Sequence, residues 1–449
     1  MISEKAKGTI EALEEGRYVN SRAVPIGEFP FTARDVLVKA PLIAGLNAYY
    51  VAGTGEGKTQ LGNDLIGLAQ NKGCYAMGRP DFEPSELLRQ IRLDKIRKAR
   101  TDKELVELTE NVRKNVFFID ELNRCPPIVQ NYFFDFFDGK IVFDGKIMKL
   151  GDGKYSIGFA TGNLGDGEYV GVSESDRALL DRFHLIVKLD HPDYRPTNAD
   201  ILKLFMGGKK NPRADMPESS KVNFDDVLAL NEEFGRRSVD ILLPILGVYF
   251  TRGLDYLEGV TGNSKKALDT RWPNVEGIRT DNDENKIFPL SPRAVFSAMG
   301  LSSALEMIAE SKGATNFTLE SNPEAAKNRV KLFLDSLRLT APYSGVIAHP
   351  YIEQAHNGSV YSAFDELFGQ NSANRRDILE KVSALETALC YALAGHRDVD
   401  LLREIAPVDG RWKPVTEAIS DFVDERANSK DEDTLVAGDI LKKVKMGGK

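Results

Sequence analysis

Cysteine, histidine and long apolar runs are all scarce in this sequence of 449 residues. The three cysteines lie far apart and form no Cys-x-x-Cys pair, which argues against a disulfide framework and indicates a reducing compartment. The five histidines are scattered, so we expect no metal site built from histidine and cysteine. The longest apolar run, residues 239–250, contains Asp240 and is too short to span a bilayer. The first residues lack the apolar core of a signal peptide, so we expect a cytoplasmic protein without membrane insertion.

An excess of positive charge is missing as well, because the formal net charge is −8. Phosphate contacts need clustered lysine and arginine, so this balance disfavours a protein that coats nucleic acid. The net charge does not exclude a local basic groove that binds nucleic acid, since residues 89–100 contain six basic side chains on an expected helix. A solvated helix face is the other interpretation of that segment. The length predicts two or three domains.

The first 195 residues alternate short apolar runs with helical patterns. Strands are expected at 47–52, 74–77, 116–119, 157–161 and 185–189, and helices at 57–70, 84–100 and 126–137. This alternation predicts an α/β fold with a mostly parallel sheet and helices on both of its faces. Between residues 139 and 150 the period changes to that of a β-hairpin set into this scaffold.

After residue 192 the strand signal almost vanishes. Helices are expected at 224–234, 239–257, 292–311, 323–337, 375–394, 413–426 and 433–445, with an irregular stretch at 344–358. We therefore predict an α/β nucleotide-binding domain at 1–195 and a helical lid domain at 196–340. The lid would carry a polar insert at about 259–286, and a mainly helical C-terminal region would follow at 341–449.

A glycine-rich loop lies between an expected strand and an expected helix. It consists of Ala52 followed by Gly53, Thr54, Gly55, Glu56, Gly57, Lys58 and Thr59. Glycines let the backbone N–H groups face a phosphate at the helix N-terminus. Lys58 would then reach the β- and γ-phosphates of ATP, and Thr59 would hold Mg²⁺. The alternative is a chance glycine-rich turn, which the strand–loop–helix context disfavours.

Two adjacent carboxylates follow the apolar run 116–119. Asp120 and Glu121 would lie at the carboxyl end of a parallel strand, where such sheets bind ligands. Asp120 would order the Mg²⁺ shell, and Glu121 would orient the attacking water, which favours hydrolysis. An ordinary strand end with exposed acids is the alternative for this pair alone.

Three further polar residues lie at the ends of expected strands or helices. Asn163 ends the strand 157–161 and could contact the γ-phosphate or its water. Arg182 falls between a helix end and a strand, and Arg293 opens the helix 292–311. A cation at a helix N-terminus opposes the helix dipole and needs an anionic partner. A surface ion pair is the alternative explanation for each arginine.

In order and spacing, these elements resemble the MoxR branch of the AAA+ ATPases over about residues 35–310. The resemblance rests on the phosphate loop and on four further motifs, namely Asp120-Glu121-Leu122-Asn123-Arg124-Cys125-Pro126-Pro127 with Val129-Gln130, Ala160-Thr161-Gly162-Asn163, Leu180-Asp181-Arg182-Phe183 and Ser291-Pro292-Arg293. It implies that Asn163 is sensor 1, that Arg182 is a finger reaching a neighbour's ATP, and that Arg293 is sensor 2 on a helical lid. It also implies a hexameric ring with a hairpin insert. Arg182 is accordingly expected to have no role within its own subunit.

Some residues depart from that family pattern. Ala52 replaces the first loop glycine, Leu164 replaces the usual proline after sensor 1, and the tail after about Leu339 matches nothing familiar. These departures concern the subfamily and leave the ATPase prediction in place.

Three functions compete at this point. The leading one is an ATP-driven machine that remodels or assembles protein substrates, for which the resemblance suggests a partner carrying a von Willebrand factor A domain. The second is a motor that translocates on or remodels nucleic acid, supported by the basic segment 89–100. The third is a nucleotide-gated binding module with little turnover, which Glu121 and Arg182 disfavour.

Overall fold

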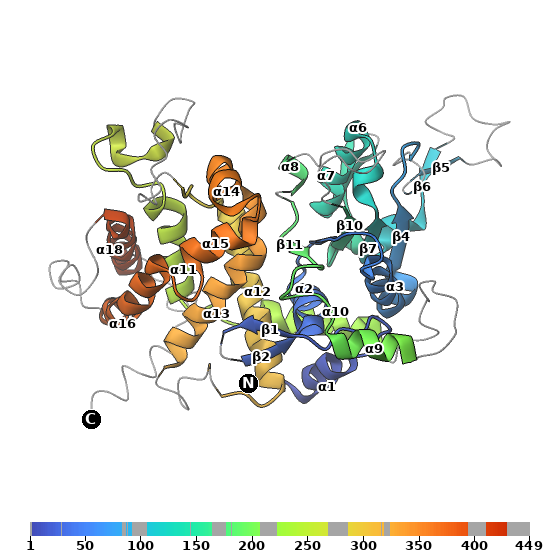
Figure 1. Cartoon of the computed structure of the whole chain (residues 1–449), viewed down its shortest axis with the longest axis horizontal. Coiled ribbons are helices and arrows are strands. Elements are labelled where there is room, and N and C mark those ends of the chain that lie inside the picture. Colours follow the sequence, from blue (N-terminus) through green and yellow to red (C-terminus); the bar gives the residue numbers. More distant parts are fainter. Residues whose placement is uncertain are drawn as a thin grey trace. The chain divides into compact units, whose positions relative to one another are not determined.

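The computed structural model divides the chain into two compact units (Figure 1). It describes residues 2–27, 29–82, 87, 89–91, 106–143, 145–163, 177–180, 182–206, 222–267, 286–315, 317, 324–393 and 410–428. The first unit comprises Met1–Pro25, Pro30–Arg236 and Met307–Gly313, and the second comprises Ile26–Phe29, Arg237–Glu306 and Ala314–Lys449. The boundaries near residues 195 and 340 remain predictions from the sequence.

A five-stranded parallel sheet forms the centre of the first unit. Its strands are β3 (Ala48–Val51), β4 (Gly73–Met77), β7 (Val116–Asp120), β10 (Ile157–Gly162) and β11 (Leu185–Lys188). Their order across the sheet is β11-β3-β10-β7-β4, and every neighbouring pair is parallel. Because β10 lies between β3 and β7, the segments that follow these three strands meet at one edge of the sheet. The expected strands and their parallel arrangement are therefore confirmed.

Helices cover both faces of this sheet, as consecutive residues of β7 show. The ring of Phe117 packs edge-on against Phe136 of α7, with 4.3 Å between centroids. The next residue, Phe118, points to the other face, where a Cβ built on Gly62 of α3 would lie 1.9 Å from its ring. All residues of β3 and β7 are buried, which explains why both read as unbroken apolar runs.

The remaining elements of the first unit are mostly short. The helices are α1 (Glu4–Ala12), α2 (Ala40–Ala44), α3 (Lys58–Ala69), α6 (Pro127–Gln130), α7 (Tyr132–Phe137), α8 (Arg177–Leu180), α9 (Asn198–Met206) and α10 (Phe224–Gly235). The strands β1 (Ala23–Ile26) and β2 (Phe29–Thr32) precede the sheet in sequence. The helix expected at 126–137 is thus present as two short helices that meet at Asn131.

Two antiparallel ribbons are inserted between strands of the sheet. The expected hairpin is confirmed as β8 (Lys140–Phe143) and β9 (Lys146–Lys149), which pair Lys140 with Lys149 and Phe143 with Lys146. The second ribbon pairs β5 (Arg89–Ile91) with β6 (Val106–Leu108). The helix expected at 84–100 is therefore wrong at 89–91, and residues 92–100 lie outside the described part of the chain.

Helices make up most of the described residues of the second unit, which also includes the end of β1 at Ile26 and the start of β2 at Phe29. Its helices are α11 (Leu242–Val248), α12 (Pro292–Ser311), α13 (Ala325–Thr340), α14 (His349–His356), α15 (Val360–Phe368), α16 (Ala373–Leu393) and α18 (Lys413–Asn428), of which the end of α12 belongs to the first unit. Aromatic rings pack in the core of this unit: Tyr249 and Phe250, which follow α11, contact Trp412 at 4.5 Å and Phe333 of α13 at 5.8 Å between centroids, respectively. The irregular stretch expected at 344–358 is wrong, because α14 lies within it. The expected helix 433–445 and most of the polar insert lie outside the described residues.

Within the described residues, no helix combines the length and the apolar character that a membrane crossing requires.

Candidate nucleotide site

The phosphate loop connects the end of β3 to the first turn of α3. Gly55 (φ 86°) and Gly57 (φ 79°) have left-handed backbones, which glycine adopts without strain. Gly57 is also the residue that caps α3, so the loop opens onto a helix N-terminus. The N–H of Gly53 donates to Asp190 Oδ2 at 3.1 Å, just beyond the end of β11. The predicted binding residues Gly53 to Thr59 therefore form a loop and the start of a helix beyond the carboxyl end of β3.

Lys58 is nearly buried (9% exposed) and its Nζ lies among three oxygens. It donates to the carbonyls of Ala52 at 2.7 Å and Gly53 at 2.6 Å, and to Asn163 Oδ1 at 2.8 Å. Burial lowers the pKa of Lys58, and the negative charges of Asp120 and Glu121 oppose that effect. The structure thus brings the predicted lysine and the predicted sensor asparagine into direct contact.

Asp120 accepts hydrogen bonds from three hydroxyl groups. Thr59 Oγ1 donates to its Oδ2 at 3.0 Å, Tyr75 OH donates to the same oxygen at 3.3 Å, and Thr161 Oγ1 donates to its Oδ1. The side chain of Asp120 is 2% exposed. A nearly buried carboxylate requires such partners, because an ionised group loses its hydration on burial.

The oxygens of Thr59 and Asp120 fit the requirements of Mg²⁺. They are hard ligands, they lie 3.0 Å apart, and they sit beside a helix N-terminus that suits phosphate. No cluster of three or more metal-ligating His, Cys, Asp or Glu side chains occurs among the described residues.

Glu121 has a strained backbone and a fixed side chain. Its φ of 55° and ψ of 44° are left-handed, which costs free energy for a residue with a Cβ. Its N–H donates to Thr161 Oγ1 at 2.9 Å, and its Oε2 lies 2.8 Å from Arg124 Nε. A Cβ on Gly78 would lie 2.2 Å from the carbonyl oxygen of Glu121, so only glycine fits beside this turn. Strain held in place by several contacts is typical of functional positions.

Asn163 follows β10 and lies between the loop and the two carboxylates. Its side-chain oxygen accepts from Lys58, and its backbone carbonyl accepts from Asn123 Nδ2 at 2.5 Å. The strand order explains this placement, because β10 is the neighbour of both β3 and β7.

Arg182 has contacts within its own subunit, and the expectation that it has no role there stays a prediction. Its Nε lies 3.5 Å from Asp138 Oδ2, and its guanidinium carbon lies 4.4 Å above the centre of the Phe134 ring. The side chain is partly exposed, so this ion pair is weak. Its assignment as a finger stays a prediction.

Arg293 lies in the first turn of α12, in the second unit. Its side chain is exposed, and Ser291 Oγ caps the helix by accepting from the N–H of Ala294 at 3.2 Å. Its assignment as sensor 2 stays a prediction.

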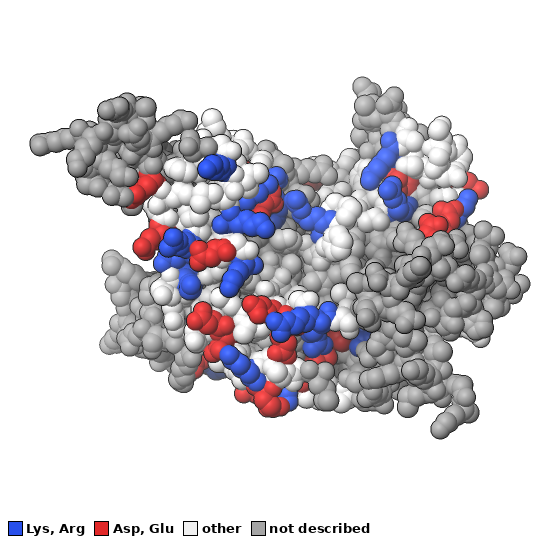
Figure 2. Space-filling view, turned by 180° about the vertical axis from the view of Figure 1, so that it is seen from behind, with Lys and Arg blue, Asp and Glu red and all other residues white. Residues whose placement is uncertain are grey.

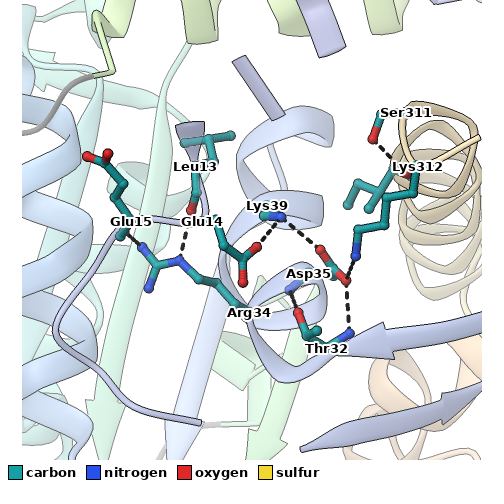
Figure 3. A network of polar contacts seen from close by, with 10 residues as sticks. Leu13, Glu14, Glu15, Thr32, Arg34, Asp35, Lys39, Ser311 and Lys312 are labelled. Atoms are coloured by element: carbon teal, nitrogen blue, oxygen red, sulfur yellow. Dashed lines mark hydrogen bonds and ion pairs between the residues drawn. The ribbon is translucent and has the colours of Figure 1, made fainter. Parts of the chain in front are cut away.

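The segment before the sheet packs against the loop helix. The N–H of Tyr18 donates to Asp64 Oδ2 on α3 at 2.9 Å, and Arg34 Nη1 pairs with that oxygen at 3.3 Å. Arg34 also donates to backbone carbonyls of the segment, including that of Glu15 (Figure 3). A Cβ on Gly57 would lie 3.0 Å from Tyr18, so the tyrosine ring borders the phosphate loop.

Several residues of this site have no role in the prediction from sequence. Thr161 and Asn123 lie inside motifs that point to the site, but only the strand order reveals what they bind. Tyr75 and Asp190 carry no sequence signal, because each acts on a residue far away in the chain.

The segment that holds most of this site is similar to a known family of domains. Residues 53–183 match the family model of the AAA domain of the dynein-related subfamily. A Cytophaga hutchinsonii protein that is provisionally described as an ATPase aligns with 84% of this chain and 93% of its own, at 15% identity and a TM-score of 0.51. A full-length MCM homolog from Methanopyrus kandleri aligns with 76% of this chain and 62% of its own, at 14% identity and a TM-score of 0.42. No protein with a curated description matches the chain in sequence.

The family match covers the phosphate loop, the paired carboxylates and the segment up to Phe183. The chain therefore contains an AAA+ domain with the P-loop NTPase fold, followed by a helical C-terminal region.

Proposed function

We propose that this chain is an ATP-hydrolysing ring ATPase of the MoxR type that remodels or assembles protein substrates. One observation supports this most: the segments after β3, β7 and β10 meet at one edge of the sheet. There Lys58 donates to Asn163, Thr59 donates to Asp120, and Thr161 bridges Asp120 and Glu121. A glycine-rich loop at a helix N-terminus lies beside them, where the phosphates of ATP would bind.

Each of these residues would have a distinct task. Lys58 would exchange its carbonyl and amide partners for the β- and γ-phosphates, and Thr59 and Asp120 would hold Mg²⁺. Bound there, Mg²⁺ would offset the negative charge of the phosphates. Glu121 would orient and polarise the attacking water, while Asn163 would contact the γ-phosphate or that water.

The division of tasks gives a direct test. Lys58→Ala should abolish ATP binding, because it removes the cation that offsets the phosphate charge. Glu121→Gln should bind ATP with nearly normal affinity and barely hydrolyse it. Binding of a fluorescent ATP analogue and phosphate release would be measured on the same preparations. Lys154→Ala and Glu110→Gln are matched controls for surface charge. Normal turnover by Glu121→Gln would show that another residue positions the water.

The hairpin β8–β9 is the proposed contact with substrate or with neighbouring subunits. Val142, Ile147 and Met148 are exposed, with Ile147 at 71%, while Ile141 is buried and Phe143 is half-buried. Exposed aliphatic side chains on a projecting ribbon suit an unfolded polypeptide, because they would bury apolar surface on binding.

A nucleic-acid motor is the second candidate. The hairpin also carries Lys140, Lys146 and Lys149, which could contact phosphates. Against it, acidic and basic side chains are interspersed over the face shown in Figure 2. ATPase rates with an unfolded protein, with DNA and with RNA would separate the two, since a motor is stimulated by the polymer on which it acts.

The assembly and the location belong to the same proposal. We expect a homo-oligomer, most simply a ring of six, that acts in the cytoplasm with a partner carrying a von Willebrand factor A domain. Size measurement with and without ATP tests the first expectation, and isolation of the intact complex from its host tests the last.

A further inference from the structure

Tyr75 stands on the edge strand of the sheet, in register with the strand that carries Asp120. Its direct neighbour across the ladder is Phe118, and the two rings lie 5.6 Å apart between centroids at 41°. Asp120 lies two residues beyond Phe118, a rise of about 6.6 Å along a strand. A tyrosine side chain that leans along the strand covers that length, so its hydroxyl reaches the carboxylate.

The hydroxyl of Tyr75 completes a set of donors around Asp120. It donates to Oδ2 at 3.3 Å, on the oxygen that also accepts from Thr59, while Thr161 holds Oδ1 from the other side. Donors on both oxygens fix the rotation of the carboxylate. The tyrosine side chain is 44% exposed, so its hydroxyl could bond to water instead.

We infer that Tyr75 is a positioning residue for the divalent cation. Its hydroxyl holds the Asp120 carboxylate in the orientation that faces Thr59, and thereby raises the affinity of the nucleotide complex for the cation. This inference rests on the proposed function, since it requires nucleotide and Mg²⁺ at the phosphate loop. The ring packs on Phe118 in any case, so the positioning role belongs to the oxygen atom alone.

The substitution Tyr75→Phe removes that oxygen and keeps the ring. ADP affinity in excess EDTA should stay the same, because the hydroxyl acts only on Asp120. The dissociation constant for Mn²⁺ in the ADP complex would be measured by electron paramagnetic resonance. It should rise about 3- to 10-fold, which is less than the full contribution of a hydrogen bond to a charged group. Unchanged or tighter Mn²⁺ binding would overturn the inference.

Three further variants make the outcome decisive. Tyr132→Phe removes the hydroxyl of an exposed tyrosine on α7 and should change nothing. Thr59→Ala should lose cation-dependent nucleotide binding altogether. Tyr75→4-aminophenylalanine keeps the ring and restores a donor, so it should return the Mn²⁺ affinity to within about twofold of wild type. If it does not, the effect of Tyr75→Phe is a packing defect and the inference is wrong.

The wild-type chain separates failure of the inference from failure of the proposed function. Wild-type protein that binds ADP and Mn²⁺ together, with Tyr75→Phe equal to it, contradicts only the role of Tyr75. Wild-type protein that shows no cation-dependent nucleotide binding contradicts both.

Discussion

Thr161 links both carboxylates of the candidate site through a single hydroxyl group. It donates to Asp120 Oδ1 and accepts from the N–H of Glu121, whose backbone is left-handed. The side chain is fully buried on the central strand β10. One hydroxyl thus ties the orientation of Asp120 to the strained turn at Glu121.

Removing that hydroxyl should separate binding from hydrolysis. Thr161→Val keeps the shape, yet it removes the acceptor of the Glu121 N–H and the hydroxyl that donates to Asp120 Oδ1. We expect kcat to fall roughly 10- to 100-fold, or about 1.4–2.7 kcal/mol, with ATP affinity changed far less. Thr161→Ser restores the hydroxyl and should recover most of the rate. Steady-state phosphate release measures both variants, and a Thr161→Val enzyme with wild-type kcat would remove Thr161 from the site.

Asp200 gives the first unit a defined response to acid. Ser21 and Thr197 each donate to its carboxylate through a backbone N–H and a hydroxyl. Burial opposes ionisation of Asp200, but these hydrogen bonds outweigh it and lower the pKa to about 2 from 3.8. A lowered folded-state pKa stabilises the protein above the unfolded value and loses that contribution as pH falls from about 4 towards 2.

The substitution Asp200→Asn should therefore destabilise the protein more at neutral pH than at acid pH. The free energy of unfolding in urea should fall by about 1–3 kcal/mol at pH 7, because charged acceptors are lost. The difference from wild type should shrink as pH falls below 4. Asp152→Asn, at an exposed position, is the control. An equal loss at pH 7 and pH 3 would show that the charge of Asp200 is not involved.

At the scale of elements, the loop helix α3 lies unusually close to the sheet. A Cβ on Gly62 would come within 1.9 Å of the ring of Phe118, which is fully buried and cannot move aside. Gly8, near the middle of α1, has nothing within 4 Å of such a Cβ. The two glycines therefore sit in helices of the same unit with opposite surroundings.

This contrast predicts opposite effects of one substitution. Gly8→Ala should stabilise the protein by about 0.5–1 kcal/mol, since alanine favours a helix. Gly62→Ala should destabilise it by about 1–3 kcal/mol, because the added methyl group displaces α3 from β7. Thermal unfolding of both variants checks the pair. Stabilisation by Gly62→Ala would mean that the helix packs less closely than the structure shows.

The sequence predicts elements well where local pattern and burial agree. The strands β3 and β7 are almost wholly apolar because both of their faces are covered, and α12 begins at a proline, which suits a first helical turn. The sequence does not indicate the ribbon β5–β6, because the apolar spacing around Ile91 also fits a helix and its partner strand begins 15 residues further on. It does not indicate the helix α14 either, because that helix is short and follows a turn-rich stretch.

The residues of the candidate site also fall into two groups, those that local sequence motifs predict and those that they do not. Lys58, Asp120, Glu121 and Asn163 stand in local motifs whose order predicts their role. Tyr75, Asp190 and the partners of Arg182 depend on which strands and helices become neighbours, and no local pattern encodes that.

At the scale of the whole molecule, the proposed role of Arg182 requires that subunits assemble. Within its own subunit it pairs weakly with Asp138 and stacks on Phe134. A finger would exchange this partly exposed pair, with 3.5 Å between nitrogen and oxygen, for the phosphates of a neighbour. A head-to-tail contact of that kind repeats until it closes into a ring or continues as a filament. Because such a finger contributes about 10³–10⁵ in rate, specific activity should rise with protein concentration.

The most direct measurement is ATP hydrolysis by mixed rings. Arg182→Ala subunits lack the finger and Glu121→Gln subunits lack the water-positioning carboxylate, so each should be inactive alone. In a mixture, an intact site of the first kind receives a finger from a neighbour of the second kind, and activity should return in proportion to such pairs. Arg182→Ala mixed with the double variant Arg182→Ala/Glu121→Gln is the control and should stay inactive. Recovery in the first mixture alone is the predicted result. No recovery in verified mixed rings, or full activity from a proven monomer, would contradict the account of a ring ATPase with shared active sites.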